Sequence, residues 1–593
     1  MTKRITISTT CPYCGVGCGV LATKQEDGSI SVKGNKDHPA NLGRLCSKGS
    51  ALADTVDLEG RLLHPQVKGR QASWDEALDA VADGFKKVID EHGPDAVAFY
   101  VSGQLLTEDY YVANKLMKGF IGSANIDTNS RLCMSSAVAG YKRAFGSDSV
   151  PCSYEDLEQA DLIVIEGSNT AWCHPVVYQR ISKAKQDNPN LKVIVIDPRR
   201  TATCDIADLH LPLKPGTDAT LFNGLLRYIN QSDTVDWDFV NNYTEGFAEA
   251  LLAAQESGLN VAYVAETCEL ERDDVERFFQ LFSSTEKVVT LYSQGINQSS
   301  SGTDKSNSII NCHLATGRIG KPAMGPFSIT GQPNAMGGRE VGGLSNQLAA
   351  HMELNNPKHH DLVSRFWKTD NLATTAGAKA VDMFNDVASG KIKAIWIMAT
   401  NPVVTLPDAD KVRAALEACE LVVVSDCEQN TDTTACADIL LPALAWGEKC
   451  GTVTNSERRI SRQRNVLPHP GEAEEDWWIV SQVAERLGFK EQFDYSSSAD
   501  IFREHAALSG FENNGVRDFD ISGLAELSDD DYDQLEPVQW PVTADKPQGT
   551  PRLFTDNKFF TESGKAQLIA ITPRPPVNAI SDEYPLVLNT GRV

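Results

Sequence analysis

The chain has 593 residues and a mass of 64.6 kDa. One hydrophobic core rarely serves so many residues, so we expect three or four domains. Hydrophobic residues make up 41% of the chain and charged residues 23%, a composition typical of globular proteins. With 55 Lys and Arg against 80 Asp and Glu, the net charge of −25 argues against nucleic acid or an anionic membrane as a partner, because both bind basic surfaces.

The sequence also predicts the compartment. No stretch approaches the ~18 uncharged apolar residues of a membrane-spanning helix. The first residues, from Met1 to Thr10, lack an apolar leader and an Arg-Arg pair, so we expect a cytoplasmic protein. Because disulfides are rare in that reducing compartment, the 14 cysteines need another explanation, such as metal binding or catalysis.

Four cysteines near the N-terminus have the spacing of a metal site. Cys11, Cys14, Cys18 and Cys46 follow the pattern C-x2-C-x3-C-x27-C. Glycines between and after the first three let the backbone turn tightly and bring N–H groups near the sulfides of a cluster. The single, distant fourth cysteine favours a [4Fe–4S] cluster over the alternative, a zinc site, which usually pairs two C-x2-4-C motifs. Lys48 is either a solvated lysine or a cation between this cluster and a second redox centre, and the spacing does not decide.

The first long element is a helix that begins near Ser73 and ends before Gly93. Ser73 and Glu76 form a capping-box pattern, and apolar side chains follow at helical spacing. A buried strand is expected over 95–101. It brings Gln104 to its carboxyl end, where open α/β sheets hold ligands.

Two later regions, 161–220 and 393–450, follow the same strand–helix–strand scheme. Each second strand is followed by a similar segment, Ala-Asp-Leu-His-Leu-Pro or Ala-Asp-Ile-Leu-Leu-Pro. We interpret this as an internal duplication of two nucleotide-type α/β units. Neither copy contains G-x-G-x-x-G, so an ordinary NAD site is not expected. The expected strands are 161–165, 191–196, 393–398 and 421–424, with helices after Pro175 and near 408–419.

Polar residues follow the strands of both copies. Asp197 and Asp426 stand at strand ends and could accept hydrogen bonds from a base or a ribose, while Asn169 and Asn401 suit a phosphate or a pterin edge. The alternative is that two Rossmann-like halves merely pack together. The Gly-rich polar segments 293–298 and 325–340 are expected to be loops that either bind a ligand or are mobile.

Several motifs together resemble those of the molybdopterin-guanine-dinucleotide oxidoreductases. They are the cysteine pattern with Lys48-Gly, Asn129-Ser-Arg-Leu-Cys133-Met-Ser-Ser, Gly167-Ser-Asn169, Asp197-Pro-Arg-Arg-Thr and Gly331-Gln-Pro-Asn-Ala-Met. The resemblance covers essentially the whole chain, and within the family it is greatest to the catalytic subunits of bacterial assimilatory nitrate reductases. It implies a multidomain α/β fold with a small N-terminal iron–sulfur domain, two Rossmann-like dinucleotide-binding units and a C-terminal domain that is cut short.

The resemblance also implies the cofactors, which are a [4Fe–4S] cluster, molybdenum and two molybdopterin guanine dinucleotides, one in each half of the duplication. The four N-terminal cysteines would hold the cluster, and Lys48 would lie between cluster and pterin. Cys133 would bind molybdenum, although on the residues alone a lone cysteine of this kind is more often a small buried hydrophobic side chain. Arg339 would face the metal and attract an anion. The residues that match the family's dinucleotide contacts are Gln104, Asn129, Gly167, Ser168, Asn169, Asp197, Gly216, Thr217, Asp218, Gln294, Gln298, Asn401, Ser425, Asp426, Lys449 and Asp476.

The residue after Cys133 separates two reactions of the family. Formate dehydrogenases that resemble this chain have a histidine there, which can handle a proton, whereas this chain has Met134, whose thioether cannot. An arginine without an adjacent base suits an anionic oxidant. The resemblance thus implies reduction of nitrate to nitrite by oxygen-atom transfer. Formate dehydrogenase, or a molybdenum-free iron–sulfur accessory subunit, is the alternative.

The electron donor is expected to be a separate soluble protein. Since no segment has the pattern of an FAD or NAD site, we expect a ferredoxin, a flavodoxin or an NAD(P)H-dependent flavoprotein subunit. The expected domains are a cluster domain at 1–57, to which segments near 455–540 return, one dinucleotide domain at 58–134 and 331–454, and another at 135–330. Residues 580–593 would begin a truncated domain that covers the cofactor. The acidic run at 526–537 is expected to be a surface segment or a linker.

Overall fold

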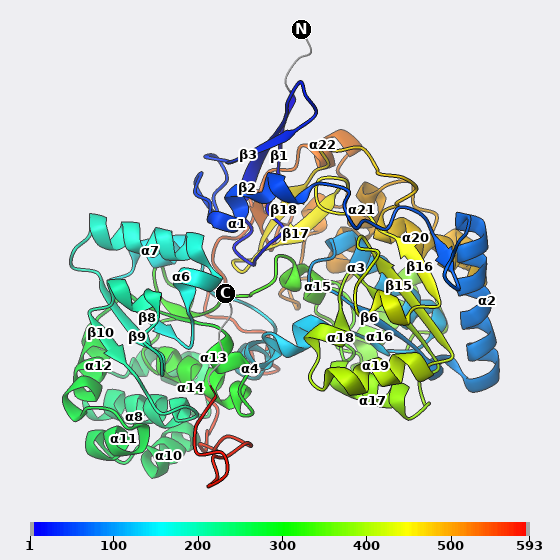
Figure 1. The fold of residues 1–593 in the computed structure, drawn as a ribbon. Helices are drawn as coiled ribbons and strands as arrows, with labels where there is room; N and C mark the ends of the chain where they lie inside the picture. Colours follow the sequence, from blue (N-terminus) through cyan, green and yellow to red (C-terminus); the bar gives the residue numbers. More distant parts are fainter. Residues whose placement is uncertain (1–4, 589–593) are drawn as a thin grey trace. The chain divides into compact units, whose positions relative to one another are not determined.

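The computed structural model describes residues 5–588 (Figure 1). By its internal contacts the chain divides into two compact units. The first comprises the residues up to Tyr13, Gly17–Leu132 and Gln332–Gly549, and the second comprises Cys14–Val16, Cys133–Gly331 and the residues from Thr550 on. Two expectations, that residues 1–10 contain no leader and that 580–593 begin a further domain, fall partly on residues 1–4 and 589–593, which lie outside the described range. The described part of that expected domain, residues 580–588, contains no helix or strand.

The first unit is built on a seven-stranded sheet with the order β5-β4-β16-β15-β14-β6-β7. The five strands from β16 to β7 are parallel, and β4 pairs with β16 in the antiparallel sense. The strands are β4 (Gln66–Val67), β5 (Arg70–Gln71), β6 (Val97–Val101), β7 (Ile126–Thr128), β14 (Ala394–Met398), β15 (Leu421–Asp426) and β16 (Ile439–Pro442).

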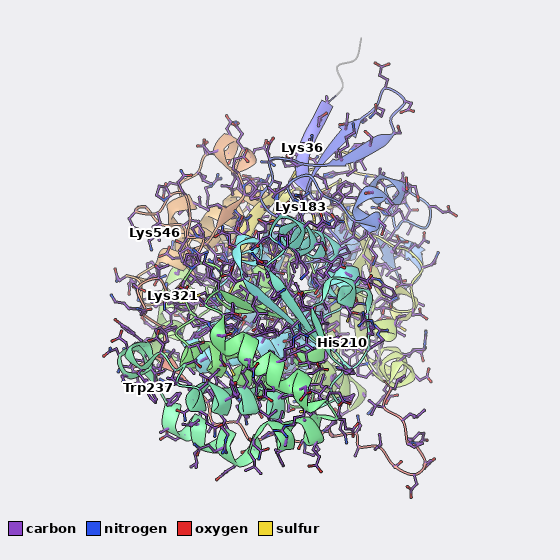
Figure 2. All side chains as sticks on the ribbon, turned by 90° about the vertical axis from the view of Figure 1, so that its left-hand side faces the viewer. Lys36, Lys183, His210, Trp237, Lys321 and Lys546 are labelled. Carbon is purple, nitrogen blue, oxygen red and sulfur yellow. The ribbon has the colours of Figure 1, made fainter. Side chains whose placement is uncertain are left out.

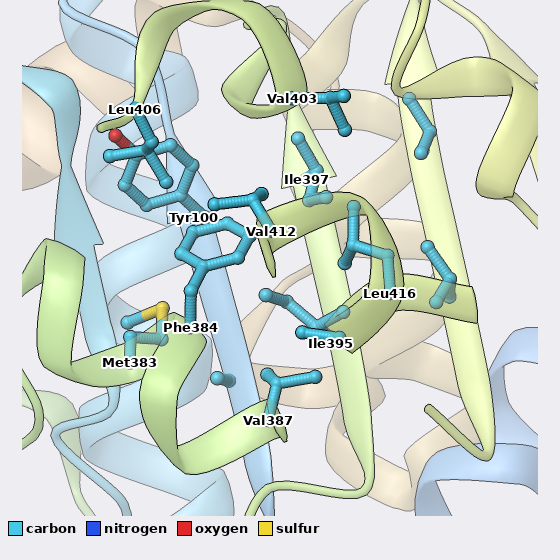
Figure 3. Close-up of a cluster of buried hydrophobic side chains, with 14 of the residues drawn as sticks. Tyr100, Met383, Phe384, Val387, Ile395, Ile397, Val403, Leu406, Val412 and Leu416 are labelled. Atoms are coloured by element: carbon cyan, nitrogen blue, oxygen red, sulfur yellow. The ribbon is translucent and has the colours of Figure 1, made fainter. Parts of the chain in front are cut away.

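Helices cover both faces of this sheet. Side chains alternate between the two faces along each strand, so a strand of apolar residues presents apolar side chains to helices on both faces. On one face, α2 (Trp74–His92) packs Phe85 against Phe99 and Trp396, with ring centroids 5.9 and 6.1 Å apart. On the other face, α17 (Ala380–Ala388) and α19 (Ala409–Ala418) cover Tyr100, whose ring meets Phe384 edge-on at 5.1 Å (Figure 3). The two helices predicted in this unit, α2 and α19, are confirmed, and the Ser73 side chain caps α2 by accepting from the Glu76 N–H.

The remaining elements of the first unit include two small antiparallel sheets. The first contains β1 (Ile5–Thr10), β2 (Gly19–Lys24) and β3 (Ile30–Gly34); the second contains β17 (Gly451–Thr454), β18 (Arg459–Gln463) and β19 (Val538–Gln539). The other α-helices are α1 (Ser47–Ser50), α3 (Thr107–Asn114), α15 (Ala335–Glu340), α16 (Pro357–Trp367), α18 (Pro402–Thr405), α20 (Asp476–Ala484), α21 (Ser498–Gly510) and α22 (Asp529–Asp533).

The second unit is built on a five-stranded parallel sheet with the order β10-β9-β8-β12-β13. Its strands are β8 (Leu162–Glu166), β9 (Lys192–Ile196), β10 (Leu209–Leu211), β12 (Val288–Tyr292) and β13 (Gly325–Ser328), and β11 (Thr244–Glu245) pairs with β20 (Ala566–Gln567) outside it. Its α-helices are α4 (Ser135–Phe145), α5 (Tyr154–Gln159), α6 (Thr170–Cys173), α7 (Pro175–Asp187), α8 (Asp218–Gln231), α9 (Trp237–Tyr243), α10 (Phe247–Ser257), α11 (Val261–Cys268), α12 (Arg272–Ser284), α13 (Gln294–Asn297) and α14 (Gly302–Ala315).

The two parallel sheets have the same strand arrangement. β10-β9-β8 in the second unit corresponds to β16-β15-β14 in the first, and the similar hexapeptides found in the sequence supply β10 and β16. Individual bonds repeat as well, since the Asp208 carboxylate accepts from the Val193 N–H at 2.8 Å and the Asp438 carboxylate accepts from the Val422 N–H at 2.9 Å. The fourth and fifth strands differ in chain order, because β12 and β13 follow their copy whereas β6 and β7 precede theirs.

Two segments differ from the loops that we expected. Residues 325–340 contain β13 and the buried helix α15, and 293–298 contain α13. The glycine content of 293–298 and 325–340 predicted loops, but in the structure these glycines allow close packing of the backbone. The acidic run at 526–537 is a surface segment, as one of its two expected alternatives had it, since its aspartates are exposed. It forms α22, capped by Ser528, and its buried Tyr532 donates to the Glu108 carboxylate at 2.7 Å. Among the described residues, no helix is long and apolar enough to cross a bilayer.

Candidate cofactor and metal site

Three of the four predicted cluster cysteines, Cys11, Cys18 and Cys46, lie in the first unit. Cys11 follows β1, and its N–H donates to the Cys18 carbonyl at 2.8 Å, which closes the loop between β1 and β2. Cys46 caps α1, and its sulfur accepts from the Gly49 N–H at 3.4 Å. A Cβ on Gly49 would stand 3.9 Å from the Cys11 sulfur, so Cys11 and Cys46 flank this glycine.

The fourth cysteine, Cys14, belongs to the second unit. Its neighbour Gly15 is fixed there, because the Gly15 N–H donates to Gly331 at 3.1 Å and the Tyr154 hydroxyl donates to the Gly15 carbonyl at 3.1 Å. Lys48 lies on α1 with an exposed side chain. Within residues 5–588, no three His, Cys, Asp or Glu side chains group closely enough to share one metal ion.

Cys133 is the first residue of the long segment of the second unit. Its side chain is buried, and Met134 after it caps α4. The Gln294 side-chain amide donates to the Cys133 sulfur at 2.9 Å. The structure therefore brings together two residues that the sequence resemblance had assigned separately, one to the metal and one to a dinucleotide.

The loop after β8 forms a close backbone contact with the loop after β12. Gly167 has a left-handed φ of +55°, and the Gly295 N–H donates to its carbonyl at 2.8 Å. A Cβ on Gly167 would lie 2.8 Å from the Gly295 Cα, so only glycine allows this approach. Ser168 and Asn169 follow in the same loop, and the Asn169 side-chain oxygen accepts from Thr203 at 3.1 Å.

The same polar contact recurs in the first unit. There the Asn401 side-chain oxygen accepts from Thr433 at 2.7 Å. In both units the threonine hydroxyl also accepts from a backbone N–H two residues after the asparagine, from Ala171 at 3.1 Å and from Val403 at 3.2 Å. The duplication thus extends to the loops that carry the predicted dinucleotide contacts, which favours related ligands in the two units.

Buried acidic residues gather at the carboxyl edge of the sheet in the second unit. Asp218 begins α8 and pairs with the buried Lys305 at 2.5 Å. Burial, and then the neighbouring Asp218, raises the pKa of Glu166 well above its usual value; burial also raises the pKa of Asp197. His210 on β10, labelled in Figure 2, donates to the Asp197 carbonyl at 2.9 Å and fixes the strand end.

Sequence reasoning missed Lys305 and Glu166. A signal for Lys305 exists, since it is the only charged residue, apart from His313, between Asp304 and Arg318. A lysine in such a helix is buried only when an acid compensates its charge.

The first unit has an equivalent acid–lysine pair. Asp476 begins α20, as Asp218 begins α8, and it accepts from the Lys449 ammonium at 2.7 Å. Burial lowers the pKa of Lys449, but Asp476 and Asp109 outweigh this effect and raise it above the usual value. Burial raises the pKa of Asp109 to about 7, and burial also raises the pKa of Asp426.

Two buried acceptor atoms among these residues fit a ligand that is rich in N–H donors. Asp476 Oδ1 and Gln294 Oε1 are buried and have no hydrogen-bond partner within the described chain. Leaving such atoms unpaired is costly. Guanine and pterin rings carry ring N–H and amino groups that would satisfy them, so the residues of both units fit the implied dinucleotides.

The remaining predicted residues lie in surroundings of several kinds. Gln104 is exposed after β6, and Asn129 accepts from the Gly103 N–H at 2.9 Å. Ser425 is buried in β15 and accepts from Trp396 at 2.7 Å.

Arg339 is buried in α15, where its guanidinium donates to the Ala335 carbonyl at 3.1 Å and contacts the Met336 sulfur at 3.2 Å. Gly216, Thr217 and Gln298 lie in the second unit; Gly216 has a φ of +94° and Gln298 is exposed.

Glu340, next to Arg339, is a buried acid that predicts a pH dependence of stability. Burial raises its pKa from 4.5 to about 7, although Thr454 and Trp540 donate to its carboxyl group at 2.8 and 2.6 Å. Between these two pH values the unfolded chain releases the proton and the folded chain keeps it. Stability conferred by this group is therefore full below pH 4.5 and is lost as the pH rises to 7, by about 3 kcal/mol.

The substitution Glu340→Gln should remove this dependence. The amide keeps an acceptor for Trp540 and a donor that the Thr454 hydroxyl can accept. Thermal midpoints measured from pH 4.5 to 7.5 should fall less steeply for this variant than for the wild type, with the exposed Glu353→Gln as the control. Parallel profiles for Glu340→Gln and the wild type would contradict the assignment.

Comparison with known proteins now gives the family. Residues 61–486 match the molybdopterin oxidoreductase model, and residues 6–58 match the molybdopterin oxidoreductase Fe4S4 domain. Over 99% of its length the chain is 56% identical to a nitrate reductase of Klebsiella oxytoca and 50% identical to one of Shewanella frigidimarina. It spans 66% and 63% of the lengths of these two relatives.

A solved structure gives the same fold. The acetylene hydratase of Pelobacter acetylenicus superposes with a TM-score of 0.75 at 22% identity, over 97% of this chain and 80% of that one. Because the identity is low, this likeness concerns the fold alone. With the family model matched across most of the sequence and the Fe4S4 domain matched at its start, the chain belongs to the molybdopterin oxidoreductase family.

Proposed function

We propose that this chain is the catalytic part of a molybdenum-dependent nitrate reductase. The reaction would convert nitrate, two electrons and two protons into nitrite and water. The observation that carries the proposal is the similarity to two nitrate reductases along nearly the whole chain. The cytoplasmic location and the assimilatory role expected from the sequence remain predictions.

The residue after Cys133 supports nitrate over formate. Met134 is buried at the start of α4, and its thioether cannot accept a proton at neutral pH. Oxidation of formate must remove a proton along with two electrons, so a base beside the metal ligand would be useful there. The buried Arg339 would supply a cation for the nitrate anion. Since formate is an anion too, the residue that separates the two substrates is Met134.

The cofactors of the proposed enzyme would be divided between the two units. When bound, molybdenum with two pterin dithiolenes supplies two-electron oxygen-atom transfer, and the cluster supplies electrons one at a time. Cys133 would hold the metal, and Cys11, Cys14, Cys18 and Cys46 would hold the cluster, with Lys48 beside it. The second unit would bind one dinucleotide through Gly167, Ser168, Asn169, Asp197, Gly216, Thr217, Asp218, Gln294 and Gln298. The first unit would bind the other through Gln104, Asn129, Asn401, Ser425, Asp426, Lys449 and Asp476.

The partner that supplies electrons would be a ferredoxin, a flavodoxin or an NAD(P)H-dependent flavoprotein subunit. One-electron transfer into the cluster needs no nucleotide site on this chain. A cluster held by the four cysteines could therefore accept electrons from any of the three donors. Reconstitution of nitrate reduction with each donor in turn would identify the partner.

An assay on the purified protein tests the proposal. The protein is prepared anaerobically and given nitrate with reduced viologen, and separately formate with oxidised viologen, after its iron and molybdenum have been measured. We expect nitrate to oxidise the dye and formate to leave it unchanged. Reduction of the dye by formate would assign the chain to the formate dehydrogenases instead. Iron without molybdenum, and no activity, would favour an iron–sulfur accessory subunit.

A further inference from the structure

The side-chain amide of Gln294 forms a hydrogen bond to the Cys133 sulfur. The Gln294 Nε2 atom lies 2.9 Å from the Cys133 sulfur, and the sulfur is buried. The amide nitrogen can only donate, so the sulfur must be the acceptor. The other amide atom, Oε1, is buried and has no donor from the described chain, which leaves it available to a ligand.

Two further hydrogen bonds hold the segments of Gln294 and Cys133 together. The Ser136 hydroxyl donates to the Asn297 carbonyl at 2.7 Å, and the Ala137 N–H donates to the Asn297 side-chain oxygen at 2.8 Å. These bonds join the first turn of α4, just after Cys133, to α13, which begins at Gln294.

The backbone contact between Gly295 and Gly167 holds α13 from the other side. The amide is therefore oriented by fixed backbone and not by a mobile loop. Such support is what keeps a hydrogen bond to a metal ligand in place.

A hydrogen bond to a thiolate changes the metal that the thiolate binds. An N–H donor withdraws electron density from the sulfur, so the sulfur donates less to the metal and the reduced metal is favoured. Hydrogen bonds to cysteine sulfur tune the reduction potentials of iron–sulfur clusters and of blue-copper sites in this way.

We infer that Gln294 is a positioning residue that sets the reduction potential of the metal through an N–H···S hydrogen bond to Cys133. The inference rests on the proposed function only in that Cys133 binds molybdenum; the substrate does not enter it. It adds to the dinucleotide contact expected for Gln294, since the two atoms of the amide would serve different partners.

Redox titration of the Mo(V) electron paramagnetic resonance signal tests the inference. Gln294→Leu removes the donor at similar volume, and Gln294→Glu keeps the shape but replaces the N–H by an acceptor. Both should lower the midpoint potentials of the metal relative to the wild type, with Glu lowering them more because of its charge. The exposed Gln280→Leu on α12 is the matched control and should leave the potentials unchanged.

A second measurement uses the wild-type enzyme and therefore does not depend on how the variants fold. Protein labelled with ¹⁵N in the glutamine side-chain amide should show a nitrogen coupling to Mo(V) in pulsed resonance spectra, and Gln294→Glu should lose it. Absence of this coupling in the wild type, or unchanged potentials in both variants with full molybdenum content, would overturn the inference.

The outcomes separate this inference from the proposed function. An enzyme that shows the coupling and the shifted potentials but does not reduce nitrate would support the role of Gln294 and refute the substrate. An enzyme that reduces nitrate without the coupling would support the substrate and refute the role.

Discussion

Replacing Cys133 with alanine is expected to abolish nitrate reduction while the iron–sulfur absorption survives. The sulfur is the only protein ligand that we propose for molybdenum, and loss of a group that merely hydrogen-bonds to a metal ligand already costs about 10- to 100-fold. The loss for Cys133→Ala should therefore exceed a hundredfold. Viologen-linked nitrate turnover, molybdenum content and the visible spectrum are the measurements.

Two features of the structure make this result informative. Cys133 is not one of the four cysteines that we expect to hold the cluster, so the substitution should leave all four cluster ligands in place. Cys204 is an equally buried cysteine in the second unit, and Cys204→Ala is the control that should keep its activity. Retained activity in Cys133→Ala would remove this residue from the mechanism.

The second large effect is expected from Lys449→Met. Lys449 is buried between Asp476 at 2.7 Å and Asp109 at 3.6 Å, and its loss leaves two acids without their cation. Breaking a buried ion pair by removing one partner typically costs about 3–5 kcal/mol. We expect a lower thermal midpoint for the variant at pH 7.5, whereas Lys411→Met, at an exposed position on α19, should leave the midpoint unchanged.

A double variant checks the cause of this effect. Lys449→Met with Asp476→Asn removes both charges of the closest pair, so it should recover part of the stability that Lys449→Met loses. If the double variant were less stable than the single one by the full cost of Asp476→Asn alone, the two residues would not be coupled, and the ion pair would not explain the stability.

The parallel strands could be predicted because each is a short apolar run. The expected strands at 95–101, 161–165, 191–196, 393–398 and 421–424 correspond to β6, β8, β9, β14 and β15. Residues 325–340 could not, because Gly325 and Pro326 break the pattern of a strand although β13 pairs with β12 through them. In a parallel sheet that is covered on both faces, pairing with a neighbouring strand decides whether a segment forms a strand. The pattern of a single segment carries no information about that neighbour.

Only part of the candidate site could be predicted from the sequence. The cysteine spacing is local, so Cys11, Cys14, Cys18 and Cys46 could be selected without a fold. Lys305 and Glu166 matter because burial places them beside Asp218, and burial arises from tertiary packing. The bond from Gln294 to Cys133 joins residues far apart in the chain, and only the structure supplies it.

The order of the strands along the chain has a consequence for synthesis. The first sheet begins with β6 and β7, but β14, which pairs with β6, is made roughly 300 residues later. At about 5–20 residues per second, the ribosome needs about 15–60 s for that interval. Meanwhile β8, β9, β12 and β13 all emerge and can pair with each other. The parallel sheet of the second unit can thus form before that of the first unit is complete, and the apolar strands β6 and β7 must be shielded until β14 leaves the exit tunnel.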